Sequence, residues 1–386
     1  MNQIGVTRTV LRSRVAGIKS RSKKIATALL VTVGLGFALS GCSPFYVLRA
    51  AYEEGKILWR REPITEFLHR PDVAEDTQEK LRLVLSVRDY ARDVLKLNVG
   101  GSYASYSYVD RPDLTYIVVA APKTELRPYT WWFPIVGHVP YKGFFSKQAA
   151  YGEVKRLQAE GYDTNVRISA AFSTLGWFDD PLLGHLLKYD KVTLAELVFH
   201  ELFHNTVYVK GAGAFNESLA NFIGHRSAID FFAARLGWGS TEHQRAQDAW
   251  HHEKEFAGFI KGVISSVAEV YRLDIPRSDK LRLRDEVFSR SKAYWADRMD
   301  GGSPSRRFRA FARQPLNNAI LMHYLVYLSN LELFESLYEA ENKKLDRFIA
   351  TIREPVKSSR DPFSVVESLL EKRGTRSAYN PSTSRQ

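Results

Sequence analysis

Two short motifs constrain the fold of this chain more than any other feature. The first is His-Glu-Leu-Phe-His at residues 200–204, and the second is Phe-Asn-Glu-Ser-Leu-Ala at residues 215–220. Residues four apart lie on one face of a helix, so His200 and His204 can reach the same metal ion. Twelve residues separate His204 from Glu217, which can return on a second helix as the third ligand. Two His and one Glu leave a fourth position open, which is typical of catalytic zinc, because a structural site is closed by four protein ligands.

Glu201 lies between the two histidines and supplies the remaining part of such a site. It can act on a metal-bound water without ligating the metal itself. The sequence therefore predicts one Zn²⁺ ion, with Glu201 as the general base. The alternative interpretation is a surface pair of His and Glu that forms salt bridges along a helix face.

The residues around the first motif predict that it lies well inside a helix. Thr193 and Glu196 form a capping box, with Thr193 as the N-cap. We expect this helix to cover residues 193–209, before two glycines that allow the chain to reverse. A second helix is expected over residues 215–236, and it would bring its first turn back over the histidines.

The first 41 residues are expected to be a signal peptide. A basic stretch at residues 8–24 precedes an apolar stretch at residues 25–39, which is short for a helix that spans a membrane. Residues 39–42, Leu-Ser-Gly-Cys, match a lipobox, so Cys42, the only cysteine, is expected to carry lipid. An uncleaved membrane anchor is the alternative. Both interpretations place the rest of the chain outside the cytoplasm. Ser43, which follows the lipidated cysteine, favours an outer-membrane lipoprotein that faces the periplasm.

The charge of the chain does not indicate a nucleic-acid partner. Residues 1–41 hold seven basic and no acidic residues, so their removal lowers the formal net charge from +12 to +5. No basic and aromatic run offers a platform on which bases could stack. With a single cysteine in the chain, no disulfide is expected, and stability must come from the core.

Secondary-structure patterns predict an α+β fold over residues 42–372, with a small N-terminal β-sheet lobe followed by a mainly helical lobe. Early helices are expected at residues 46–60 and 76–97. The β-rich part, about residues 100–173, contains expected strands at 102–109, 115–119, 130–139 and 164–173, with a helix at 147–161. In the helical part, residues 193–372, further helices are expected at 241–273, 278–298, 316–338, 341–352 and 362–372. Residues 373–386 are expected to be a disordered tail.

The chain resembles a family of predicted bacterial aminopeptidases, which are lipoproteins with a gluzincin-like zinc site. The resemblance rests on the two motifs and on residues 132–137, 141–145, 173–181 and 317–319. It covers most of the mature chain and implies a zinc peptidase whose substrate lies in a cleft between the two lobes. In related zinc aminopeptidases, an Asn-Glu-x-x-Ala run like residues 216–220 supplies the third zinc ligand.

The resemblance also implies a tyrosine, far along the chain, that donates a hydrogen bond to the oxyanion of the tetrahedral intermediate. Tyr324 is the expected donor, with Tyr327 and His323 as alternatives on the same predicted helix. The competing interpretation is that these side chains pack between helices. An aminopeptidase further needs a carboxylate near the substrate amine, for which Asp179 and Asp180 are candidates. Turn chemistry before a proline is the alternative role for these two aspartates.

Two asparagines of the second helix are expected to form hydrogen bonds that hold the metal ligands in place. Metal-bound histidines usually donate their other ring N–H to an acceptor, and Asn221, one turn after Glu217, can accept it. Asn216, which precedes Glu217, is expected to take a similar supporting role.

The sequence thus predicts a zinc-dependent peptide hydrolase, an aminopeptidase that trims peptides in the periplasm. Two alternatives remain open. A zinc endopeptidase acting on envelope proteins is one, because the Gly-x-Met-x-Asn loop that recognises a free amino terminus in the related enzymes is absent. A catalytically silent zinc-binding scaffold lipoprotein is the other.

Overall fold

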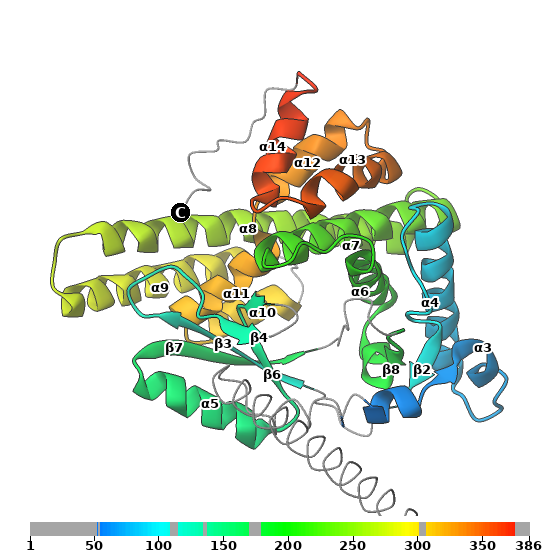
Figure 1. Cartoon of the computed structure of the whole chain (residues 1–386), viewed down its shortest axis with the longest axis horizontal. Helices are drawn as coiled ribbons and strands as arrows, with labels where there is room; N and C mark the ends of the chain where they lie inside the picture. Colours follow the sequence, from blue (N-terminus) through cyan, green and yellow to red (C-terminus); the bar gives the residue numbers. More distant parts are fainter. Residues whose placement is uncertain are drawn as a thin grey trace, which may run out of the picture.

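The computed structural model describes residues 52, 55–108, 115–133, 137–169, 179–300 and 306–374. It confirms the predicted α+β class, with a small sheet lobe beside a larger helical lobe (Figure 1). Cys42, the predicted signal peptide and most of the predicted tail lie outside the described residues. Within the described ranges, none of the helices combines the length and apolar character that crossing a membrane requires.

The main sheet is antiparallel and has the strand order β6-β3-β7. Strand β3 (Thr115–Pro122) pairs with β6 (Lys142–Phe144) on one side and with β7 (Tyr162–Ser169) on the other. Alternate residues of β3 point to opposite faces. Val118 and Ala120 pack under helix α5 (Lys147–Ala159), whereas Val119 and Ala121 join the main core of the protein. The sheet therefore contributes to both cores and lies directly against the helical lobe.

The remaining strands are short. The region predicted as one strand at 130–139 is a hairpin of β4 (Trp131–Phe133) and β5 (Gly137–Val139). Gly137 has a φ of +77°, a backbone conformation that glycine adopts readily, so the chain turns there rather than continuing straight. A second sheet joins β1 (Glu62–Pro63), β2 (Ser105–Ser107) and β8 (Leu182–Leu183) beside α3 (Ile64–Phe67).

The helical lobe holds most of the chain. Its helices are α4 (Glu75–Asp93), the 3₁₀ turn η1 (Gly184–Lys188), α6 (Lys191–His204), α7 (Gly213–Leu236), α8 (Thr241–Arg272), α9 (Arg277–Asp300), α10 (Arg306–Arg313), α11 (Asn318–Leu328), α12 (Leu331–Ala340), α13 (Leu345–Lys357) and α14 (Pro362–Glu371). Figure 1 shows α6 and α4 on one side of the molecule and the β6-β3-β7 sheet on the other, with α7 and α8 crossing above both. Helix α10 is not anticipated by the sequence pattern. Of the helix predicted at 46–60, the described residues 55–59 are helical.

Helix α6 begins earlier than the sequence pattern predicts. The expected capping box at Thr193 is wrong, because Asp190 is the N-cap and accepts hydrogen bonds from Val192 N at 3.0 Å and Thr193 N at 3.1 Å. The helix also ends at His204 rather than at residue 209. Its second histidine therefore lies in the last turn, immediately before the chain reverses.

The helix predicted at 316–338 is two helices, α11 and α12. Asn330 has a φ of +53°, which interrupts the helical path. Ser218 of α7 fixes the break, because its hydroxyl donates to Val326 O at 3.0 Å and accepts from Ser329 N at 2.9 Å. The end of α11 is thereby held beside the first turns of α7.

A buried ion pair joins the two lobes at the other end of the sheet. Arg284 Nη1 of α9 donates to Asp163 Oδ2 of β7 at 2.9 Å, and Asn318 N of α11 donates to the same oxygen at 3.1 Å. Both charged side chains are about nine-tenths buried, at 9% exposure each. These contacts fix how β7 lies along the helical lobe.

Candidate metal centre

The two histidines of the first motif point to the same side of α6. Their Nε2 atoms lie 3.2 Å apart and their ring centroids 4.9 Å apart. Leu202 and Phe203, between them in the sequence, are fully buried on the opposite side of the helix and set its rotation. His204 is buried at 4% exposure, whereas the His200 side chain keeps 14%. The pair therefore lies at the boundary between core and solvent, where a substrate can reach it.

Glu217 reaches the histidines from near the start of α7, where it is the fifth helical residue. The connection before it is held by Asn216, whose Oδ1 accepts from Val209 N at 2.9 Å and whose Nδ2 donates to Val209 O at 2.8 Å. Glu217 Oε2 then lies 3.3 Å from His200 Nε2 and 3.8 Å from His204 Nε2. Asn216 thus supports the centre by fixing the turn, through hydrogen bonds to the backbone of Val209 rather than to a histidine.

The three donor atoms fit a single metal ion. They form a triangle with edges of 3.2, 3.3 and 3.8 Å. Tetrahedral zinc with bonds of about 2.0–2.2 Å places its ligand atoms about 3.3–3.5 Å apart, so the triangle has nearly the size that one ion needs. The structure therefore brings together His200, His204 and Glu217 as a group that could hold a metal ion. Three ligands leave one tetrahedral position open.

The electrostatics of the group keep the carboxylate ionised. Burial raises the pKa of Glu217, but hydrogen bonds from His200 and His204 outweigh burial and hold this pKa well below its usual range. Burial lowers the pKa of His204, yet hydrogen bonding to Glu217 and the charges of Glu217 and Glu201 raise it overall. An anionic oxygen facing two imidazoles is a donor set that attracts a divalent cation.

The close approach of α7 to α6 depends on Gly224. A Cβ at this position would lie 2.7 Å from the carbonyl oxygen of Glu196 and 3.3 Å from Cβ of His200. The first contact is with backbone, which cannot move aside unless the two helices separate. Gly224 therefore sets the distance at which the helix of Glu217 passes the helix of the histidines.

We expect Gly224→Ala to lower stability by about 1–3 kcal/mol, the usual cost of overpacking, and to weaken zinc binding by displacing Glu217. Thermal unfolding and calorimetric zinc titration measure the two effects. Gly262→Ala is the matched control, because no atom lies within 4 Å of a Cβ there. That control should leave zinc binding unchanged. Equal zinc affinity in both variants would show that Gly224 does not set the geometry of the centre.

Asn221 does not contact the histidines as the sequence pattern suggests. Its Nδ2 donates to Glu253 Oε1 at 3.1 Å and to the carbonyl oxygen of Tyr327 at 3.2 Å. The side chain is buried between α7, α8 and α11, so it ties three helices together. In the described part of the chain, Nδ1 of His204 is buried and has no hydrogen-bond partner.

Tyr324 does not take the place expected for the oxyanion donor. Its ring packs in the core, 5.0 Å from the ring of Phe256 and 5.8 Å from that of Phe311, and Gln314 Nε2 lies 3.3 Å from its hydroxyl. Tyr327, one turn later, lies beside the metal centre instead. Its ring is stacked on His200 with centroids 6.4 Å apart and an angle of 27°. His323, the other alternative, lies 5.1 Å from the Tyr327 ring.

The two aspartates proposed for the substrate amine have different surroundings. Asp179 Oδ1 accepts from Gly101 N at 2.7 Å, an exposed contact between residues 78 positions apart in the sequence. Asp180 is buried at 5% exposure, and its carbonyl oxygen accepts from Tyr103 N at 2.6 Å. Burial raises the pKa of Tyr103, and the charges of Glu201 and Asp180 raise it further, so both carboxylates neighbour this phenol. Of the two, Asp180 shares the neighbour Tyr103 with Glu201.

Sequence reasoning misses three further side chains near the centre. Burial raises the pKa of Tyr141 and of Tyr208, and the nearby charge of Glu217 adds to both rises. Tyr141 belongs to one of the segments that carry the family resemblance, which is the signal that could have found it. Tyr103 has a φ of +59°, a strained conformation for a tyrosine that sequence alone does not reveal.

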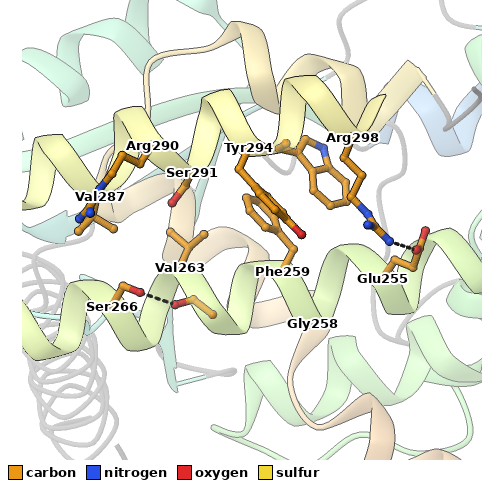
Figure 2. A pocket seen from close by; sticks show the side chains of 12 residues that line it. Glu255, Gly258, Phe259, Val263, Ser266, Val287, Arg290, Ser291, Tyr294 and Arg298 are labelled. Atoms are coloured by element: carbon orange, nitrogen blue, oxygen red, sulfur yellow. Dashed lines mark hydrogen bonds and ion pairs between the residues drawn. The ribbon is translucent and has the colours of Figure 1, made fainter. Parts of the chain in front are cut away.

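A separate groove lies between α8 and α9 (Figure 2). Phe259 stacks on Trp295 with centroids 4.5 Å apart, and Arg298 pairs with Glu255 at 2.6 Å at one end. Gly258 and neighbouring small residues leave the groove shallow. None of the residues that line it belongs to the donor triangle.

A family model described as "Putative aminopeptidase" matches residues 45–361. The matched range contains both motifs, the β6-β3-β7 sheet and the whole of α11. No curated protein and no solved structure matches the chain.

Proposed function

The chain belongs to the putative aminopeptidase family, and from this premise we propose that it is a zinc-dependent peptidase. One ion would be held by His200, His204 and Glu217. The observation that carries the proposal is the donor triangle, whose edges of 3.2, 3.3 and 3.8 Å suit one tetrahedral ion. Two His and one Glu with an open position make zinc the proposed metal.

Bound zinc supplies Lewis acidity, which makes a water molecule nucleophilic at neutral pH and polarises the scissile carbonyl. Glu201 lies on the same helix as both histidines, and its charge acts on His204. As general base it accepts the proton of the attacking water. It then transfers this proton to the nitrogen of the leaving amine, which departs neutral.

The oxyanion that develops on the scissile carbonyl needs a hydrogen-bond donor. Tyr327 is the proposed donor, because it is the tyrosine stacked on His200. Burial raises the pKa of Tyr327 well above its usual range, and the charge of Glu217 adds to the rise. The phenol therefore stays protonated at neutral pH and can donate.

We propose that the substrate is a peptide with a free amino terminus. A protonated amine bound near the centre requires a carboxylate partner. Asp180 is the proposed partner, because it shares the neighbour Tyr103 with Glu201. Cys42, by the lipobox, would tether the enzyme to the outer membrane on its periplasmic side, where such peptides arise from envelope proteins.

A peptide library tests this function. Protein from Ser43 onward, loaded with zinc, is incubated with peptides whose amino termini are free or acetylated, and products are identified by mass spectrometry. Stepwise loss of N-terminal residues from free peptides alone is the expected result. Internal cuts in both sets would make the protein an endopeptidase. No products from either set would leave a zinc-binding scaffold as the better account.

A further inference from the structure

An arginine from the sheet lobe reaches the helix that carries Tyr327. Arg167 lies on β7, where it pairs with Ile117 of β3, and its side chain extends toward α11. Its Nη1 is 2.6 Å from His323 Nε2, and its guanidinium carbon is 5.7 Å from the centroid of the Tyr327 ring. These contacts join residues 156 positions apart in the sequence. The sheet thus contributes a cation next to the metal centre.

The contacts of Arg167 leave its charge uncompensated. A guanidinium only donates, so His323 Nε2 must be the acceptor and the neutral imidazole carries its proton on Nδ1. Among the described residues, this side chain therefore contacts a neutral imidazole and the phenol of Tyr327, neither of which carries a negative charge. Its Nε is buried with no hydrogen-bond partner among those residues. A partly buried cation with this environment is poorly explained by stability alone, since buried charges are normally paired.

The position of the cation suits a reaction that creates negative charge. A guanidinium within about 6 Å of a ring centroid attracts the π-electrons of that ring. Drawing density from the phenol makes its O–H a stronger hydrogen-bond donor. The ring itself neighbours Arg167, His323 at 5.1 Å and His200 at 6.4 Å.

We propose that Arg167 is a positioning residue of the hydrolytic centre, which holds the Tyr327 ring beside His200 and strengthens its hydroxyl as the donor to the oxyanion. This inference rests on the proposed peptidase function. Arg167 acts through Tyr327 and does not itself touch substrate. The role of the sheet lobe then extends beyond binding peptide, because β7 supplies a group that the reaction needs.

A double-mutant cycle tests the proposal in the zinc-loaded protein. Removing one oxyanion donor costs about 10²–10³-fold in kcat, so Tyr327→Phe should show a loss of this size with KM little changed. Arg167→Met should lower kcat by at least about 10-fold. The double variant should be no more than about 3-fold slower than Tyr327→Phe alone, because Arg167 works through the missing hydroxyl. Losses that multiply would overturn the proposal.

Two further variants separate positioning from loss of structure. Arg167→Lys keeps the charge but not the planar fork, and it should recover part of the kcat lost in Arg167→Met. Arg284→Lys is the matched control, because Arg284 anchors the same strand through Asp163 at 2.9 Å. That control should lower the melting temperature while leaving kcat within about 2-fold. An equal loss of kcat in Arg284→Lys and Arg167→Met would mean that any weakening of the contacts of β7 lowers kcat, and it would contradict a specific role for Arg167.

A binding measurement keeps the inference separate from the proposed function. A phosphinic analogue of dialanine mimics the tetrahedral oxyanion, and calorimetry measures its Kd without turnover. Arg167→Met and Tyr327→Phe should each weaken its binding at least about 10-fold, at unchanged zinc content. If the wild type cleaves no peptide, this binding still decides the role of Arg167. Equal affinity in wild type and Arg167→Met would contradict it.

Discussion

Glu201→Gln is expected to leave zinc bound and to slow peptide hydrolysis by about 10²–10⁴-fold, the range that a general base contributes. The amide has nearly the size of the carboxylate, so the packing of α6 should not change. It cannot accept a proton from the attacking water, and kcat should fall far more than KM rises. Steady-state kinetics and elemental analysis of the same preparation measure both quantities.

Glu196→Gln is the matched control for that change. Glu196 lies on the same helix and its carboxylate pairs with His225 Nδ1 at 2.9 Å, an interaction that an amide can partly replace. Hydrolysis by this variant should stay within about 2-fold of the wild type. A Glu201→Gln protein that retains full activity would exclude Glu201 as the base.

Glu217→Gln is expected to weaken zinc binding by at least about 100-fold. Changes to groups outside the ligand sphere already cost about 10–100-fold in metal affinity, and this substitution removes a charged ligand itself. The three donor atoms would become two imidazoles and a neutral amide. Competition titration with a chromogenic chelator measures the affinity, and activity at limiting zinc should fall with it.

Glu332→Gln provides the comparison for the third ligand. Glu332 lies near the start of another helix, α12, and its side chain is 58% exposed with Lys261 at 3.4 Å. The substitution should leave zinc affinity unchanged. If Glu217→Gln binds zinc as tightly as this control does, the third ligand must be another group.

The donor triangle can be predicted from the sequence because its parts are local. His200 and His204 share one helix face, and Glu217 returns after a single short connection, so helical periodicity and a reversal suffice. The limits of α6 are harder to predict, since Asp190 and Thr193 are both good N-caps. The structure uses Asp190, whose carboxylate satisfies two backbone donors and the Thr193 hydroxyl.

The tyrosine at the centre illustrates what periodicity cannot decide. Tyr324 and Tyr327 are one turn apart on an almost entirely apolar helix, so either can face the metal. The choice depends on tertiary contacts, because Ser218 fixes the end of α11 at 3.0 Å from Val326 O. The aromatic core around Phe256 then encloses Tyr324.

The roles of Arg167 and Gly224 could not be predicted from sequence patterns for a related reason. Arg167 meets His323 across 156 positions of sequence, and nothing in the strand around it indicates that contact. Gly224 lies in the interior of helix α7, where a glycine usually lowers the stability of the helix and does not indicate a function. Its role becomes evident only in the structure, where a Cβ at this position would lie 2.7 Å from the carbonyl oxygen of Glu196 in α6.

We propose that peptide hydrolysis depends on one zinc ion in the triangle of His200, His204 and Glu217. The most direct measurement is the rate of peptide hydrolysis by metal-free protein as zinc is added in known amounts. We expect no hydrolysis before zinc is added, a linear rise in rate as zinc is added, and a plateau at one ion per chain. Hydrolysis by the metal-free protein, or a rate that does not depend on zinc, would contradict it.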